Sequence, residues 1–305
     1  MNSSFFQPYI FIQANPAHPR PPGWGAGAGR VGLDKHVWLT KWPTPAGPLR
    51  VNAARNSSLT SFACSKAMLP LSCISALTTK IYLGTSILVL PYHNPVELAK
   101  YAATLDQFSA GRLILGVGVG GMVEEFEALG IPMSQRAILT NESINIMHEL
   151  WENDLPSYNS TRWNFNNVTF SPKPYNSNIP IWVGGSSAGA IKRAATLGDG
   201  WHPSGITALE FAEGKSKIEE ICTTINRDPN EINYSIRLDV SPDETSANPR
   251  HGLSLNGKDP LQIAEIVNTY QEKGLDHVIF AISSSDITET KLIAERISAT
   301  TFDQF

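Results

Sequence analysis

The stretch that decides the fold is IYLGTSILVL at residues 81–90, followed by a helical pattern at 95–108 and by LILGV at 113–117. Both short runs are almost entirely apolar, as strands are when a sheet buries both of their faces. The segment between them carries apolar residues at helical spacing, and Pro95 suits its first turn. A buried strand, a helix and a second buried strand in this order predict parallel pairing.

The same alternation continues to the C-terminal part of the chain, and two further strands fit upstream of residue 81. Eight strand–helix units in 305 residues favour the α/β class and a (β/α)8 barrel over an open sheet. A polar and aromatic stretch interrupts the pattern and predicts an excursion with a hairpin near residues 152–178. The other expected strands cover residues 9–13, 36–40, 179–183, 200–202, 232–240 and 277–281, and the other expected helices cover 124–129, 134–151, 188–197, 209–224, 260–273 and 288–299.

Composition excludes several classes of protein. With 42% hydrophobic and 17% charged residues, the chain is not of the disordered type. A formal net charge of −4 argues against a nucleic-acid partner, and no apolar run reaches the roughly 18 residues that suggest a membrane span. The three cysteines, Cys64, Cys73 and Cys222, form no CxxC motif, which suits a reducing compartment and makes the cytoplasm the expected location.

The N-terminal part of the chain differs in charge from the rest. Residues 1–96 contain one acidic and eight basic residues. A targeting peptide, a nucleic-acid-binding arm and a segment that no longer fits the fold behind it are three interpretations of this composition. The basic region, apolar region and cleavage site of a secretory signal do not occur in order, and no basic cluster alternates with aromatic residues. We therefore expect an irregular, disordered or degraded segment at 1–32, an irregular first unit, and a barrel domain at 33–305.

The barrel predicts that functional residues follow the C-terminal ends of strands. GVGVGG at 116–121 lies at such a place and contains the G-x-G-x-x-G pattern. A dinucleotide-binding unit would need an acidic residue about 20 positions later at a strand end, but Asn141 stands there in a helical stretch. Two interpretations stay open: a loop whose backbone N–H groups approach a phosphate, and a tight turn without a ligand.

A second loop of this kind, GGSS at 184–187, also follows a strand and opens a helix. Ser186 or Ser187 could cap that helix and still donate to a phosphate oxygen. Two such loops at the mouth of one barrel favour a phosphorylated ligand lying across it.

His93 and His202 each follow an expected strand and are the candidate catalytic residues, the alternative being an ordinary hydrogen-bonded role. Glu124 and Glu125 open the helix after the first glycine loop, where acidic side chains complement the helix dipole. The sequence contains no HExxH, Walker A or G-x-S-x-G motif. Neither a metal site nor a serine nucleophile is therefore expected.

A resemblance to a known family rests on LGTSILVLPYHNP at 83–95, ATLDQFSAGRLILGVG at 103–118, IWVGG at 181–185 and GDGW at 198–201. These motifs resemble the luciferase-like monooxygenase family over residues 74–282, most closely its branch dependent on coenzyme F420, a deazaflavin. Bacterial-luciferase-type relatives use FMN instead. The resemblance implies a (β/α)8 barrel, commonly a homodimer without metal. It implies an oxidoreductase or monooxygenase that transfers hydride between F420, or FMN with oxygen, and a small organic substrate.

The resemblance also implies positions for the cofactor. The ring would lie over the C-terminal end of the barrel, backed by a non-proline cis peptide between Ser86 and Ile87. The cofactor phosphate would meet backbone amides of both glycine loops. The residues implied there are Val119, Gly120, Gly121, Gly184, Gly185, Ser186 and Ser187.

Two departures from the family pattern concern catalysis. The second strand of family members usually ends in a pair such as Asp-His, and the matching positions here hold Lys41 and Trp42. Some sugar-phosphate-oxidising members place an acidic residue where Gly121 stands. A second hypothesis is therefore a non-catalytic or defective member that at most binds a flavin phosphate.

Overall fold

The computed structural model of the protein describes residues 9–11, 68–242, 247–248, 252–282, 284 and 287–301. The strand expected at 36–40, and the expected boundary between an irregular segment at 1–32 and a barrel domain at 33–305, lie outside the described residues.

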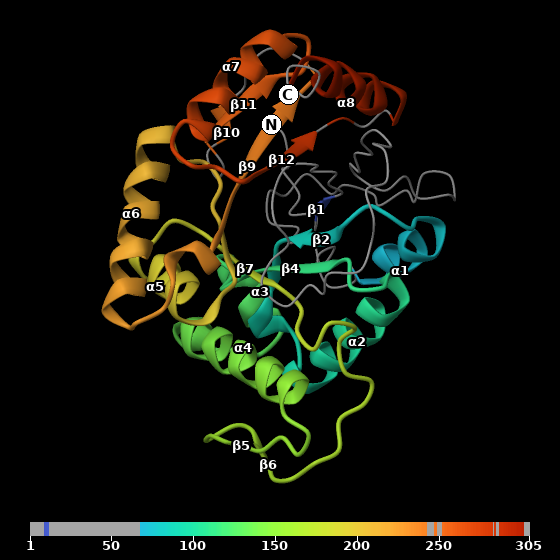
Figure 1. The fold of residues 1–305 in the computed structure, drawn as a ribbon, viewed down its shortest axis with the longest axis vertical. Coiled ribbons are helices and arrows are strands. Elements are labelled where there is room, and N and C mark those ends of the chain that lie inside the picture. Colours follow the sequence, from blue (N-terminus) through green and yellow to red (C-terminus); the bar gives the residue numbers. More distant parts are fainter. Residues whose placement is uncertain are drawn as a thin grey trace.

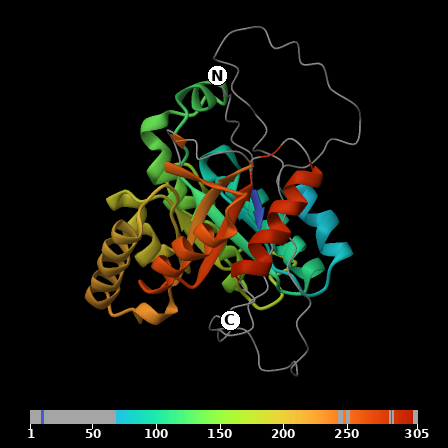
Figure 2. The ribbon, with the colours of Figure 1, turned by 90° about the horizontal axis from the view of Figure 1, so that it is seen from above.

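A curled sheet of parallel strands forms the centre of the molecule, with helices around it (Figures 1 and 2). Hydrogen-bonded neighbours follow the order β2-β4-β7-β8-β9, and β12 extends the sheet from β9. The parallel α/β architecture predicted from the sequence is therefore confirmed. The parallel strands are β2 (Leu83–Ser86), β3 (Leu88–Val89), β4 (Leu113–Gly118), β7 (Ile181–Gly184), β8 (Gly200–His202), β9 (Asn233–Ser241), β11 (Gly252–Asn256) and β12 (His277–Ile282).

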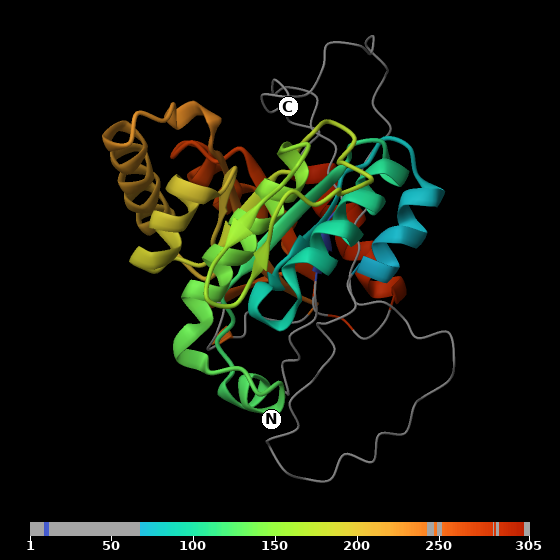
Figure 3. The same cartoon turned by 90° about the horizontal axis from the view of Figure 1, so that it is seen from below.

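Most of the helices lie between successive strands and cover the outside of the sheet (Figures 1 and 3). Helix α2 shows why they form where they do: the Asn94 side chain accepts hydrogen bonds from Val96 N and Glu97 N, and Pro95 occupies the first turn. Helix α1 precedes the first predicted helix and was not predicted. The helices are α1 (Met68–Leu77), α2 (Pro95–Ser109), α3 (Val123–Ala128), α4 (Arg136–Glu152), α5 (Ala188–Leu197), α6 (Ala208–Thr224), α7 (Pro260–Gln271) and α8 (Ile287–Thr301).

Strand β1 (Tyr9–Phe11) departs from the predicted topology. It falls within the strand expected at 9–13, but it pairs antiparallel with β2, with Ile10 opposite Thr85. The prediction of parallel pairing is therefore wrong for this strand. An apolar run indicates burial but not chain direction, so the sequence pattern could not have revealed this. β1 also comes within 8 Å of β12, which brings the two edges of the curled sheet together.

The excursion after α4 contains the predicted hairpin. Strands β5 (Tyr158–Asn159) and β6 (Asn164–Phe165) pair antiparallel, and they extend beyond α4 in Figure 1. The Tyr158 and Phe165 rings stack with their centroids 6.2 Å apart. The excursion expected near 152–178 is thus confirmed.

Strand β4 shows how the sequence leaves space inside the barrel. Leu113, Leu115 and Val117 alternate toward the helices and belong to the main apolar core. The intervening positions are Ile114, then two glycines. A Cβ at Gly116 would lie 1.8 Å from the Thr85 carbonyl oxygen, and one at Gly118 would lie 2.3 Å from Ile87 Cδ1. The upper half of β4 therefore has no side chains on its inner face, and Ile87 packs against it.

Candidate active site

A cavity of about 600 Å³ opens at the C-terminal ends of the parallel strands. Functional residues were expected at this end of the barrel. The volume is within the range of roughly 300–1,000 Å³ that small-molecule and cofactor sites occupy. Its lining residues are Ser86, Ile87, Val89, residues 118–125, Gly184, Gly185, His202, Ser204 and Arg237.

The structure brings most of the predicted site residues together around this cavity. Ser186 and Ser187 do not line it: they are exposed beyond the glycine pair, and the Ser187 side chain caps α5 by accepting from Ala190 N at 3.3 Å. His93 also lies outside the lining and follows the short 3-10 helix η2 (Leu90–Tyr92), where its backbone N–H donates to Leu90 O. The predicted residues that line the cavity are Ser86, Ile87, Val119, Gly120, Gly121, Gly184, Gly185 and His202.

The peptide bond between Ser86 and Ile87 is cis, which confirms the expectation from the family resemblance. It separates β2 from β3 within the apolar run at 81–90. The Ile87 side chain lies against Gly118 and Gly184 and forms the apolar floor of the cavity.

The glycines of the loop after β4 serve different purposes. Gly120 has a φ of +77°, and a Cβ there would lie 2.6 Å from Val89 Cγ1. The fold itself therefore requires glycine at this position. At Gly121 a Cβ would meet no described atom within 4 Å. Gly121 also lines the cavity, so its backbone is not covered by a side chain there.

The two glycine loops also differ in charge. Glu124 and Glu125 stand in the first turn of α3, after the first loop. The first turn of α5, after Gly184 and Gly185, contains no acidic residue. The first turn of α5 therefore suits an anionic group better than that of α3 does, because its helix N–H groups have no acidic side chain of the same turn beside them.

A hydrogen-bonded chain of side chains lies below the second loop. Ser86 Oγ is 2.6 Å from His202 Nε2, and His202 Nδ1 is 2.7 Å from Ser235 Oγ. Ser235 Oγ donates in turn to the Trp201 carbonyl oxygen at 3.2 Å. Burial of His202, with the nearby Arg237 and His277, lowers the pKa of the imidazole to about 3, so it is neutral at physiological pH.

Glu125 and Arg237 also line the cavity, and neither was assigned to it from the sequence. Glu125 is 6% exposed and accepts a hydrogen bond from the Tyr92 hydroxyl at 2.7 Å. Arg237 on β9 pairs with Asp239, whose Oδ1 lies 2.8 Å from Nη2. Arg237 and Asp239 occupy alternate positions in the mostly apolar segment at 232–240. This pattern could have indicated Arg237 as a site residue.

The family model for luciferase-like monooxygenases matches residues 30–274, which is most of the chain. The chain belongs to the luciferase-like monooxygenase family. The match includes both glycine loops and the strands that carry Ser86 and His202. The family resemblance inferred from the sequence motifs is therefore confirmed.

The proteins to which this chain is similar include F420-dependent enzymes and a monooxygenase. An F420-dependent glucose-6-phosphate dehydrogenase of Segniliparus rotundus is 25% identical over 260 residues, covering 71% of this chain and 77% of the dehydrogenase. The F420-dependent tetrahydromethanopterin reductase of Methanopyrus kandleri superimposes with a TM-score of 0.66 at 17% identity, covering 79% of this chain and 88% of the reductase. A monooxygenase of Streptomyces bottropensis gives 0.65 at 16% identity, covering 77% and 80%. These structural likenesses confirm the barrel fold.

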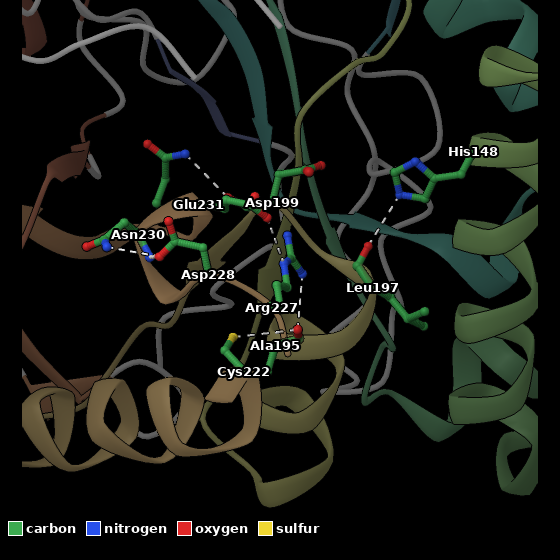
Figure 4. Close-up of polar contacts among 10 residues, drawn as sticks. His148, Ala195, Leu197, Asp199, Cys222, Arg227, Asp228, Asn230 and Glu231 are labelled. Atoms are coloured by element: carbon green, nitrogen blue, oxygen red, sulfur yellow. Dashed lines mark hydrogen bonds and ion pairs between the residues drawn. The ribbon is translucent and has the colours of Figure 1, made fainter. Parts of the chain in front are cut away.

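The luciferase-like chain carries a second group of polar residues at the opposite end of the barrel, where β7 and β8 begin (Figure 4). Asp199 Oδ2 accepts from Ile181 N at 2.8 Å, and burial raises the pKa of this carboxyl group. Arg227 Nη1 donates to Ala195 O at 3.0 Å. Since residues at this end of such barrels serve stability, we assign this group no part in the site.

The described part of the chain offers neither a metal site nor a membrane-spanning helix. Residues 9–11, 68–242, 247–248, 252–282, 284 and 287–301 contain no group of three or more His, Cys, Asp or Glu residues placed to hold a metal ion. Among the helices formed by these residues, none is long and apolar enough to cross a membrane.

Proposed function

We propose that this luciferase-like protein is an oxidoreductase that binds coenzyme F420 and exchanges hydride with a small organic substrate. The observation that carries the proposal is the cavity lined by both glycine loops, with Gly121 open on one side and Gly184 and Gly185 on the other. The names of the similar dehydrogenase and reductase, both F420-dependent, support the choice of cofactor.

The residues around the cavity fit a ring with a phosphorylated side chain. Ile87 and Val89 offer an apolar surface to a planar ring, and the missing side chain at Gly121 leaves space beside it. The phosphate would bind at residues 184–187, because the α5 first turn has no acidic residue whereas the α3 first turn has Glu124 and Glu125. Val119, Gly120 and Gly121 would then contact the ring rather than the phosphate.

FMN, acting with oxygen, is the alternative cofactor. Its support is the similarity in fold to a monooxygenase. The apolar floor at Ile87 and the open second loop suit a flavin ring and its phosphate equally well. The geometry of the cavity therefore favours a phosphorylated flavin or deazaflavin as a class, and the named relatives favour F420 within it.

A bound F420 would supply hydride transfer, and the protein must then handle the accompanying proton. Among the described residues that line the cavity, the ionisable side chains are Glu124, Glu125, His202 and Arg237. His202 has both ring nitrogens hydrogen-bonded to serines, and an arginine keeps its proton. Glu124 is exposed, whereas Glu125 is buried and fixed by Tyr92. Glu125 is thus our choice for accepting or donating the proton of the substrate.

The assembly and location proposed with this function follow from the family and from composition. We propose a homodimer, and the exposed Tyr101 and Phe108 on α2 are side chains that a second copy could cover. We propose the cytoplasm because the sequence has only three cysteines and no CxxC motif. Sedimentation analysis of the purified protein tests the dimer.

The test of the function is a fluorescence titration of the full-length protein with F420 and, separately, with FMN. We expect saturable binding of F420 with a lower Kd than that of FMN. The reverse order would replace F420 by FMN. If the folded protein binds neither cofactor, the proposed oxidoreductase function is overturned. The hypothesis of a defective family member then remains.

A further inference from the structure

We infer that the chain Ser86–His202–Ser235 fixes the Ser86 hydroxyl as a hydrogen-bond acceptor toward the ligand, with His202 as the residue that positions it. This inference rests on the proposed function in one respect, namely that the ligand in the cavity is a flavin or deazaflavin. The direction of the hydrogen bonds follows from the protein alone.

The direction is set at the Trp201 end of the chain. A carbonyl oxygen can only accept, so the single hydrogen of the Ser235 hydroxyl is donated to Trp201 O, 3.2 Å away. Ser235 Oγ must then accept from His202 Nδ1, at 2.7 Å, and the proton of His202 is on Nδ1.

The other ring nitrogen determines what Ser86 does. A neutral imidazole that carries its proton on Nδ1 has an acceptor at Nε2. The groups close to His202 favour the neutral form: Arg237 on β9 and His277 on β12 oppose a second positive charge, and the imidazole is only 3% exposed. Ser86 therefore donates its single hydrogen to His202 Nε2, 2.6 Å away. Only lone pairs remain on Ser86 Oγ for a ligand.

This polarity restricts what can contact Ser86 from the cavity. Ser86 precedes Ile87 in the floor, so the group that meets it belongs to the ring region of the ligand. An acceptor there would face the lone pairs of Ser86 Oγ, whereas a ring N–H would be paired. F420 and FMN both carry an imide N–H on the ring, and either can satisfy the serine.

The same geometry changes the role expected for His202. A general base needs a nitrogen that can reach the substrate, and both nitrogens of His202 are engaged with serines. His202 acts on the ligand through Ser86 and is a positioning residue.

Two substitutions at His202 separate its two hydrogen bonds. In His202→Gln the side-chain amide reaches the place of Nε2, so its oxygen can accept from Ser86. In His202→Asn the shorter side chain reaches the place of Nδ1 and can donate only to Ser235. Ser86→Ala removes the acceptor directly and serves as the reference for full loss.

The first readout is the Kd for F420 and for FMN by fluorescence titration. We expect Ser86→Ala and His202→Asn to weaken binding about 5- to 10-fold, as for loss of one hydrogen bond, and His202→Gln to bind within about twofold of wild type. Equal affinities of all three variants and the wild type would overturn the inference. So would a loss in His202→Gln as large as that in His202→Asn.

The second readout is made on the wild-type protein without cofactor, so it does not depend on whether the variants fold. In ¹⁵N-histidine-labelled wild-type protein, NMR correlation spectra report which ring nitrogen of His202 carries the proton. We expect the neutral form protonated on Nδ1. A proton on Nε2, or on both nitrogens, would overturn the polarity of the chain. If the wild type binds neither F420 nor FMN, the proposed function and the ligand part of this inference both fail, and the NMR result still decides the polarity.

Discussion

Ser86 Oγ and His202 Nε2 are 2.6 Å apart, although the two residues are separated by 116 positions in the sequence. The contact joins the end of β2 to the end of β8 beneath the cavity, with β4 and β7 between those strands in the sheet. It makes the Ser86 hydroxyl a fixed part of the cavity wall.

Gly120 is required by the fold, so its replacement should act on stability. In Gly120→Ala, the φ of +77° would strain the backbone and the new Cβ would lie 2.6 Å from Val89 Cγ1. We expect the free energy of unfolding to fall by about 1–3 kcal/mol in urea titrations. Ala128→Leu, at an exposed position on the neighbouring helix α3, is the control and should be close to neutral. A Gly120→Ala protein as stable as wild type would contradict the placement of this loop.

Glu125 should matter for turnover and not for cofactor affinity. Glu125→Gln keeps the size of the side chain but removes the proton acceptor held by Tyr92. Once a substrate screen has identified a reactive alcohol or carbonyl compound, we expect kcat to fall at least about 100-fold in this variant. The matched control is Glu124→Gln, because that side chain is adjacent but exposed. Equal kcat values for the two variants would remove Glu125 from the mechanism.

Asp106 gives the stability a pH dependence whose sign can be stated. Its carboxylate oxygens accept from Leu113 N and Tyr175 N, but burial raises its pKa from 3.8 to about 6. The folded state thus holds this proton more tightly than the unfolded state. The resulting stabilisation is fully present below pH 3.8 and is lost as the pH rises through 6.

This dependence can be measured against a variant that lacks the carboxyl group. Between pH 5 and pH 7, the free energy of unfolding of wild type should fall by about 1 kcal/mol relative to that of Asp106→Asn. Parallel pH profiles of the two proteins would show that burial does not raise the pKa of Asp106.

The polar group at the opposite end of the barrel should affect stability alone. Arg227→Ala removes the donor to Ala195 O, and we expect a loss of about 1 kcal/mol in the free energy of unfolding. The Kd for F420 should stay the same, because neither Arg227 nor the residues labelled with it in Figure 4 line the cavity. A weaker Kd in a folded Arg227→Ala protein would show that the two ends are coupled.

The sequence was informative where local pattern and buried structure agree. The apolar runs at 81–90 and 113–117 and the helix between them specify one strand–helix–strand unit, and the structure contains it. The glycine loops could be predicted because glycines between a strand and a helix allow backbone N–H groups to approach a ligand. Strand β11 was missed, since the segment GLSLN has only two strongly apolar residues.

Other features depend on contacts between distant residues, which a single sequence does not reveal. From the sequence, Glu125 in the first turn of α3 was expected only to complement the helix dipole. The structure shows that its side chain is buried beside Tyr92. His202 was expected as a catalyst from its position at a strand end. Its two serine partners come from β2 and β9, and they point instead to a positioning role.

The proposed function depends most on the cavity being a cofactor site open at Gly121. The direct measurement is an equilibrium fluorescence titration of F420 into wild-type protein, Gly121→Leu and the control Ala128→Leu. Gly121 lines the cavity, and a Cβ there would meet no described atom within 4 Å, so we expect the leucine to occupy cavity space and the variant to fold normally. We predict saturable binding by wild type and by Ala128→Leu, and a Kd at least tenfold higher for Gly121→Leu. Equal affinity of a folded Gly121→Leu protein and the wild type would contradict the placement of the cofactor in this cavity.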